Sequence, residues 1–223
     1  MKIVIYGNGA MAKVLFSYAR DSFEIAGFTV DGACIAEGVD TFCGLPLVAF
    51  DKLVGEFPPQ THKIIIAVGF SEMNELRVRK YNEARDNGYG FESYIHRSVI
   101  RHIDVEIGEN TVILDQVSIH PGSRIGKNTF ISSNVNIGHD CTVGSGNWIN
   151  AGVALAGGVE TGENCFFGIN SSVSQGVRVG AGNFIGANAF IAYSTGADEV
   201  YLSEPGKLLP RMKSKAFLKF SRI

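Results

Sequence analysis

The sequence has little proline, no excess of charge of either sign and no long apolar run. Six of its 223 residues are proline, and the formal net charge is −2. The near-neutral charge gives no support for nucleic-acid binding along the chain. No run approaches the roughly 18–20 apolar residues of a membrane-spanning helix, and the apolar start at residues 3–5 is too brief for a secretion signal. We therefore expect a cytoplasmic protein with no transmembrane segment and no nucleic-acid partner.

Cysteine is sparse, and its spacing suggests no redox or metal motif. The four cysteines, Cys34, Cys43, Cys141 and Cys165, form no C-x-x-C pair. In a chain for which we expect no export, such cysteines are reduced thiols.

Glycine, in contrast, is in clear excess. Its 27 copies among 223 residues are about 12% of the chain, against a usual value of ~7%. The excess comes without proline, and 45% of the residues are hydrophobic, whereas disordered segments are poor in apolar residues. The lack of a Gly-X-Y triplet repeat excludes collagen. These glycines must therefore serve a folded structure.

The N-terminal residues have the pattern of a nucleotide-binding unit. Residues 2–6 are a short β-branched run that stops at a G-x-G-x-x-A turn, residues 7–12, and a helical pattern follows. Glycines let the backbone approach a phosphate, and the start of a helix offers free N–H groups. A second strand over 24–30 ends at Asp31, where such units place a carboxylate on a ribose hydroxyl. The alternatives are a purely structural turn and a turn-forming aspartate.

Further strands and a helix complete this region. A third strand over 63–68 ends at Gly69, a helix is expected over 73–87, and a strand near 91–95. Strands that alternate with helices give a small parallel α/β layer. We therefore expect a βαβ, Rossmann-like nucleotide-binding domain over residues 1–98. It is too small for a full dinucleotide fold, so we expect it to bind a mononucleotide rather than NAD.

From residue 107 onward, an apolar anchor recurs at every sixth position. Fourteen of the 15 anchors between residues 107 and 191 are apolar, and glycine follows eight of them. The residue four after most anchors is small or β-branched. This period predicts a parallel β-helix over 99–206, in which each hexad is one strand and one corner and three hexads close a coil of about 18 residues.

The same repeat offers a use for the glycines and for two cysteines. We expect glycine at the corners because they require backbone conformations that a Cβ would strain. Cys141 and Cys165 lie at small inward positions, so we expect them to be buried fillers and not a disulfide.

With these motifs the chain resembles the bacterial nucleotide-sugar acetyltransferases that modify amino sugars for surface glycans such as the lipopolysaccharide O-antigen, a group that includes sialic-acid O-acetyltransferases. The resemblance covers nearly the whole chain, and its carriers are residues 7–14, 64–69, 136–141 and 168–171. It implies a left-handed β-helix and a homotrimer with active sites between subunits. It also implies acetyl-CoA in the groove between neighbouring β-helices and a nucleotide-linked amino sugar on the N-terminal domain.

The chain departs from the family pattern at three places. The glycine loop reads Gly9-Ala10-Met11 where the family has Gly-Gly-His, and Trp148 stands where many members have a second histidine. The usual Gly-x-Pro-Ala-Lys ending is replaced by residues 203–207, and a further tail follows.

His139 is the predicted general base. It follows the anchor Ile137 by two residues, so it lies at a corner and points outward, and Gly157 lies one coil further on. Acyl transfer from a thioester needs a base for the proton of the acceptor and donors for the oxyanion. We expect Asp140 to orient the imidazole and Gly157 or Gly158 to offer a backbone amide. The alternative is a solvated corner histidine.

The remaining site residues follow from the two predicted ligands. The expected acetyl-CoA contacts are Gly157, Gly158, Ile169 and Ala187. The expected contacts to the nucleotide sugar are Gly7, Gly9, Ala10, Met11, Asp31, Gly69 and Trp148. For Trp148 we consider two roles, an anchor between subunits and a wall of the acceptor pocket.

Two further features have competing interpretations. His102, His120 and His139 follow one corner and could bind zinc, as in β-helical carbonic anhydrases. The uncertain direction of His120 beside Pro121, and the family resemblance, favour no metal. The tail over 207–223 carries six Lys/Arg and no acid, with helical spacing of apolar residues. We expect it to pack on the end of the β-helix; contact with CoA phosphates or a membrane surface is the alternative.

The predicted function is acetyl-CoA-dependent N-acetylation of a nucleotide-linked amino sugar. His139 would deprotonate the acceptor, which attacks the thioester directly. A covalent acyl-enzyme is not expected, because neither Cys141 nor Cys165 faces outward. The alternatives are O-acetylation of a sugar such as sialic acid, and a non-catalytic trimeric nucleotide-sugar-binding protein. The sequence leaves the nucleotide, the sugar, the acylated position and the size of the acyl group open.

Overall fold

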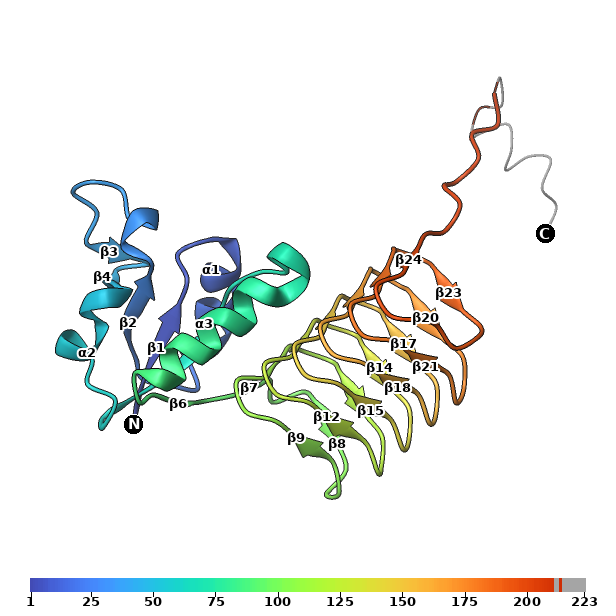
Figure 1. Cartoon of the computed structure of the whole chain (residues 1–223), viewed down its shortest axis with the longest axis horizontal. Helices are drawn as coiled ribbons and strands as arrows, with labels where there is room; N and C mark the ends of the chain where they lie inside the picture. The colour runs from blue at the N-terminus through green and yellow to red at the C-terminus, as the bar shows by residue number, and fades with distance from the viewer. Residues whose placement is uncertain (211–212, 214–223) are drawn as a thin grey trace.

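The computed structural model describes residues 1–210 and residue 213 and consists of an α/β domain and a three-sided prism of stacked coils (Figure 1). Its coils follow one another in a row from Tyr94 to Tyr201 (Figure 1). In this described part, no helix is long and apolar enough to cross a membrane.

The α/β domain contains the predicted strands and helices. They are β1 (Lys2–Tyr6), α1 (Ala10–Ala19), β2 (Ile25–Val30), β5 (His62–Ile66), α3 (Glu75–Asp86) and β6 (Gly90–Phe91). The sheet order is β3-β4-β2-β1-β5-β6, and its neighbouring strands are parallel except β3 and β4. The parallel α/β layer predicted from the alternation is therefore confirmed.

Residues 31–60 hold structure that the sequence pattern did not reveal. Its elements are η1 (Gly32–Cys34), β3 (Thr41–Phe42), β4 (Leu45–Ala49), η2 (Phe50–Lys52) and α2 (Leu53–Glu56). These elements are two to five residues long, too short for a helical or strand period to be recognised. A further turn, η3 (Ser71–Asn74), precedes α3.

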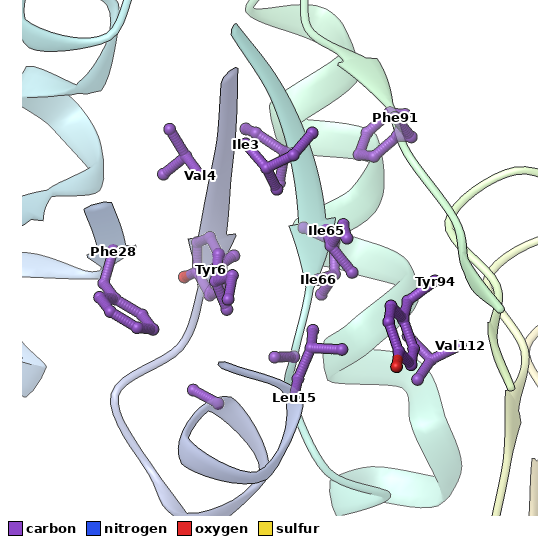
Figure 2. Packing of buried hydrophobic residues seen from close by; sticks show 14 of the residues in the cluster. Ile3, Val4, Tyr6, Leu15, Phe28, Ile65, Ile66, Phe91, Tyr94 and Val112 are labelled. Carbon is purple, nitrogen blue, oxygen red and sulfur yellow. The ribbon is translucent and has the colours of Figure 1, made fainter. Parts of the chain in front are cut away.

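The core of the α/β domain lies on both sides of β1 and β5. Ile3, Ile5 and Ile65 are at most 2% exposed, and Leu15 of α1 and Phe28 of β2 join the same cluster (Figure 2). Burial of each such side chain contributes about 1.5–3 kcal/mol. The continuous apolar runs of β1 and β5 suit parallel strands that are covered on both faces.

Three parallel sheets form the sides of the prism, and each strand pairs with the strand 18 residues away. We name the faces after their outward side chains. The aromatic face contains β7 (Tyr94–Ile95), β10 (Val112–Ile113), β13 (Phe130–Ile131), β16 (Trp148–Ile149), β19 (Phe166–Phe167), β22 (Phe184–Ile185) and β24 (Val200–Tyr201). The small-residue face contains β8 (Ile100–Arg101), β11 (Ser118–Ile119), β14 (Asn136–Ile137), β17 (Ala154–Leu155), β20 (Ser172–Val173) and β23 (Phe190–Ile191). The charged face contains β9 (Glu106–Ile107), β12 (Arg124–Ile125), β15 (Thr142–Val143), β18 (Glu160–Thr161) and β21 (Arg178–Val179).

The register confirms the predicted 18-residue coil. The anchors and the small residues four positions later point inward and form one buried cluster. Cys141 and Cys165 are fully buried members of this cluster with free thiols, as predicted. The ladder begins at Tyr94, which pairs with Val112, and thus upstream of residue 99, where the sequence placed the start of the β-helix.

The explanation predicted for the glycines needs a correction. The glycines directly after the anchors do not have positive φ angles. At Gly138, for example, a Cβ would lie 2.6 Å from the nitrogen of Gly157 and 2.7 Å from the carbonyl carbon of Ala156. These glycines are required by the close approach of the next coil. Positive φ angles occur two residues later, where glycine alternates with Asn, Asp and Gln, as at Gly122, Asn128 and Asp140.

The α/β domain covers the aromatic face from β7 to β19, so the two parts share one hydrophobic cluster. Tyr94 and Val112 of the prism lie side by side and belong to this cluster together with Phe91 (Figure 2). Apolar packing in this cluster therefore joins the two parts.

Arg77 of α3 makes polar contacts across the same junction. It is 1% exposed and donates hydrogen bonds to the carbonyls of Val68 (3.4 Å), Asn128 (3.1 Å) and Asn110 (3.3 Å). Burial lowers the pKa of Arg77 to about 9. The hydrogen bonds of Arg77 therefore connect the end of β5 to two corners of the prism.

The predicted amphipathic helix of the tail lies largely outside the described residues. Residues 207–210 are exposed and form no helix.

Candidate functional site

The predicted site residues lie in two places, a cavity in the α/β domain and the edges of the prism. The cavity has a volume of about 350 Å³. Six of the seven residues predicted for the nucleotide sugar line it: Gly7, Gly9, Ala10, Met11, Asp31 and Gly69. It lies where β1, β2 and β5 end, which is where open α/β sheets bind their ligands.

The glycine loop at the end of β1 has a conformation that only glycine permits. Gly7 has a φ of +136°, and a Cβ there would lie 2.9 Å from the carbonyl oxygen of Ala67. Helix α1 then begins at Ala10, with no side-chain cap and no acidic residue in its first turn. Its first N–H groups are therefore free, and the positive end of the helix dipole favours an anion at this point.

Asp31 lies in the cavity wall with two partners that the sequence did not reveal. The Tyr6 hydroxyl donates to Oδ1 of Asp31 (2.7 Å), and Nζ of Lys80 lies 2.9 Å from Oδ1 and 2.8 Å from Oδ2. Burial alone would raise the pKa of Asp31, but the hydrogen bonds from Lys80 and Tyr6 outweigh it and lower this pKa. Asp31 is therefore an anionic acceptor at neutral pH. Tyr6 lies in β1 and Lys80 in α3. Neither belongs to a loop motif from which a role in ligand binding could be predicted.

His139 lies at the corner between β14 and β15, which we call the His139 edge; it joins the small-residue face to the charged face. Its side chain is 61% exposed, and Nδ1 lies 2.8 Å from Oδ2 of Asp140. A carboxylate can only accept a hydrogen bond. In the neutral imidazole the proton therefore lies on Nδ1, and Nε2 has a lone pair that can accept an incoming proton.

Gly157 makes room for this imidazole on the next coil. A Cβ at Gly157 would touch Nε2 of His139 and would lie 2.8 Å from Cε1 and 2.9 Å from Cδ2. The glycine therefore accommodates the imidazole itself, and not only a ligand as the sequence suggested. Within residues 1–210, the N–H of Gly157 finds no acceptor and is free to donate to a ligand.

Gly158 does not have the donor role that we predicted as one alternative. Its N–H donates to the carbonyl of His139 (2.8 Å) as part of the contact between coils. Gly158 has a φ of +69°, so glycine is favoured here by the left-handed backbone conformation of the corner.

The other two residues predicted to contact acetyl-CoA lie on a different edge. Ile169 (54% exposed) and Ala187 follow β19 and β22. They belong to the corner that joins the aromatic face to the small-residue face, which we call the Ile169 edge. The small-residue face separates this edge from the His139 edge, so a single chain does not bring the two groups together.

Neither role predicted for Trp148 fits the structure. Trp148 is 4% exposed, stacks on Phe130 at 4.1 Å between ring centroids, and contacts Phe70 at 5.6 Å. It is a packing residue of the junction between the α/β domain and the prism. The missed signal is an apolar or aromatic side chain at every eighteenth position, at Val112, Phe130, Trp148, Phe166 and Phe184.

His102 and His120 are exposed. Among the described residues, no group of three or more His, Cys, Asp or Glu side chains is arranged to hold a metal ion.

Comparisons with known proteins agree with this architecture. Residues 104–139 match the family model described as bacterial transferase hexapeptide (six repeats). A comparison with curated protein sequences finds no match. Among solved structures, PerB from Caulobacter crescentus, in complex with CoA and GDP-perosamine, is 28% identical, with a TM-score of 0.80 over 90% of this chain and 93% of that one. A histidine variant of this perosamine N-acetyltransferase, with the same two ligands, is 27% identical, with a TM-score of 0.80 over 90% and 92%.

A more distant structure has the same fold. The acetyltransferase domain of PglB from Neisseria gonorrhoeae is 22% identical, with a TM-score of 0.80 over 93% of this chain and 99% of that one. Together these matches confirm the predicted fold class, an α/β domain followed by a left-handed β-helix of hexapeptide repeats. They also confirm the resemblance to sugar acetyltransferases of this superfamily and support an acyltransferase.

Proposed function

We propose that this chain is an acetyl-CoA-dependent N-acetyltransferase that acts on the amino group of a nucleotide-linked amino sugar. The observation that carries the proposal is the exposed His139–Asp140 pair, in which Nδ1 is hydrogen-bonded and Nε2 is left with its lone pair. The likeness to PerB, whose structure holds CoA and GDP-perosamine, supports the same reaction class.

The chemistry at His139 is a direct transfer. Nε2 removes a proton from the amino group as its nitrogen attacks the thioester carbonyl. The tetrahedral intermediate carries an oxyanion, for which the N–H of Gly157 is the available donor. Collapse of the intermediate breaks the C–S bond, and the imidazolium returns the proton to the leaving thiolate. The products are the N-acetyl sugar and CoA.

Cys141 does not provide a nucleophile for a covalent acyl-enzyme. Cys141 lies directly after the His139–Asp140 pair, yet its side chain is fully buried and its thiol contacts the carbonyl of Ala156 at 3.2 Å. Burial also raises the pKa of this thiol, so it has little thiolate character.

The division of the predicted CoA contacts between two edges supports a homotrimer with shared sites. The outward side chains of the small-residue face are short, at Ser118, Ala154 and Ser172, so a second prism can approach closely. Exposed apolar side chains stand at its two ends, Ile100 (65%) and Phe190 (64%). A neighbouring copy packed on this face would bring its Ile169 edge toward the His139 edge of the first, with acetyl-CoA between them.

The cavity of the α/β domain suits the nucleotide part of the acceptor. The free N–H groups at the start of α1 suit a diphosphate, and Asp31 offers an anionic acceptor to the nucleoside. Acetyl-CoA and nucleotide sugars are metabolites of the cytoplasm, so the proposal places the enzyme there, in the synthesis of a surface glycan.

The proposal is tested by release of CoA thiol from acetyl-CoA in the presence of UDP-, GDP- and dTDP-linked amino sugars. We expect release with at least one acceptor and an amide in its product by NMR. An ester in the product would instead establish O-acetylation. Nucleotide-sugar binding without thiol release from any acceptor would favour the non-catalytic binding protein.

A further inference from the structure

Lys80 lines the cavity, and no ligand-binding motif in the sequence points to this residue. It projects from α3, is 8% exposed and lines the cavity together with Asp31 and Tyr6. Its ammonium group lies 2.9 Å from Oδ1 and 2.8 Å from Oδ2 of Asp31, and 2.8 Å from Oε2 of Glu83. These three contacts match the three N–H donors of a lysine. Lys80 therefore has no donor left for a ligand.

Asp31, in contrast, keeps acceptor capacity toward the cavity. Its Oδ1 receives the Tyr6 hydroxyl and Lys80, whereas Oδ2 receives only Lys80, and the side chain is 42% exposed. A carboxylate oxygen has about two lone-pair sites. Glu83 contacts Lys80 but does not line the cavity, and Asp31 is the one acidic side chain among the described residues that line it.

We infer that Lys80 is a positioning residue that, with Tyr6, fixes Asp31 as a charged acceptor, and that the cavity thereby selects nucleosides that donate hydrogen bonds at this point. The inference rests on the proposed function in one respect, that the cavity takes a nucleotide. A nucleoside has two sources of such donors, the hydroxyl pair of the ribose and the ring N–H of uracil or guanine. Cytosine and adenine present a bare ring nitrogen at the corresponding position.

Nucleoside diphosphates separate these sources without any acetyl transfer. Calorimetric titration would compare UDP with CDP and GDP with ADP for the base, and UDP with 2′-deoxy-UDP and GDP with 2′-deoxy-GDP for the ribose. A charge-assisted hydrogen bond lost from a ligand corresponds to roughly ten- to hundred-fold weaker binding. We expect weaker binding of this size either when the base lacks the ring N–H (CDP, ADP) or when the ribose lacks its 2′-hydroxyl. Either result supports the inference.

Variants at Lys80 test the positioning role. Lys80→Met should bind the preferred nucleotide about ten- to hundred-fold more weakly, and Lys80→Arg, which keeps the charge, should restore most of the affinity. Lys63→Met is the matched control, because Lys63 forms an ion pair with Glu92 at 2.9 Å in the same domain but does not line the cavity. Thermal unfolding of each variant checks that it is folded.

A pH series distinguishes positioning of Asp31 from a general structural effect. The groups that act on Asp31 are Tyr6 on β1 and Lys80 and Arg79 on α3, and Glu83 lies beside Lys80. Without Lys80, burial dominates and the pKa of Asp31 rises, so Asp31 becomes protonated as the pH falls. The ratio of the dissociation constants of Lys80→Met and wild type should therefore increase from pH 7.5 to pH 5. Titration of the ligand's phosphate cancels in this ratio.

Three results would overturn the inference. The first is binding of CDP, ADP and both deoxynucleotides within about three-fold of UDP and GDP. The second is a Lys80→Met protein, or an Asp31→Asn protein should Lys80→Met not fold, that keeps wild-type affinity and selectivity. The third is a ratio that does not change with pH. Failure of every nucleotide to bind would instead contradict the proposed nucleotide-sugar site itself.

Discussion

At the scale of single residues, the candidate active site depends on glycines that make room for other side chains. Gly157 leaves space for the His139 imidazole, and Gly122 does the same for Asp140. A Cβ at Gly122 would touch Oδ1 of Asp140 and lie 3.3 Å from its Cγ. Asp140 is hydrogen-bonded to Nδ1 of His139. A side chain at Gly122 would therefore displace Asp140 and disturb the orientation of the His139 imidazole.

The first prediction concerns Gly122→Ala. We expect kcat for acetyl transfer to fall by about ten-fold or more, because loss of one oriented hydrogen bond of roughly 1.4 kcal/mol corresponds to a factor of ten. KM for the nucleotide sugar should change little, because Gly122 is remote in the chain from the cavity residues. Steady-state kinetics measures both.

Gly182→Ala is the control for this prediction. Gly182 has a similar φ (+70° against +74°), and a Cβ there would lie 3.3 Å from Cγ of Asp198, but it is at a different edge of the prism. The strain is therefore matched and His139 is not involved. Equal activity in the two variants would show that Gly122 has no role in positioning.

At the scale of elements, the three faces of the prism have different outward residues and different tasks. The aromatic face is covered by the α/β domain from β7 to β19. The charged face carries the exposed ion pairs Arg124–Glu106 and Arg178–Glu160, and the small-residue face is open. Trp148 at the middle of the aromatic face is where the α/β domain packs through Phe70 and Arg77.

The second prediction concerns this packing. Trp148→Ala should lower the free energy of unfolding by about 3–5 kcal/mol, as expected for truncation of a large buried aromatic side chain. Trp148→Phe should cost clearly less, because it keeps the stack on Phe130. Denaturant unfolding measures both, and a Trp148→Ala protein of wild-type stability would contradict the assigned packing role.

The repeat and the strand–loop–helix start were predictable because each depends on a local period or a fixed spacing. The contacts of Trp148 and Lys80 were not, because they depend on how segments far apart in the chain meet. Asp31 was found as a strand end, but its partner Lys80 lies 49 residues further on. Likewise, the sequence placed glycines near corners, but only the stacked coils show that Gly138 is needed because Gly157 approaches it.

At the scale of the whole molecule, the proposed CoA contacts are split between the His139 edge and the Ile169 edge, and a shared site would bring them together from two copies of the chain. The third prediction tests this proposal. Ala154→Arg introduces a long charged side chain in the middle of the small-residue face and should dissociate the proposed homotrimer and abolish acetyl transfer. Circular dichroism should remain that of the wild type, because residue 154 points outward.

Thr142→Arg provides the comparison for assembly. Thr142 occupies the equivalent outward register on the charged face, so we expect it to leave both mass and activity unchanged. Sedimentation velocity measures the mass of each variant. An Ala154→Arg protein that stays trimeric and active would exclude this face as the contact between copies.

The rate of CoA thiol release measures whether His139 is the base for acetyl transfer. We predict that His139→Ala lowers kcat by about 10²–10⁴-fold, the usual contribution of a positioned general base. His120→Ala, which removes another exposed histidine that also follows a strand of the small-residue face, should retain wild-type turnover. A His139→Ala protein that releases CoA within a few-fold of the wild-type rate would exclude His139 as the general base.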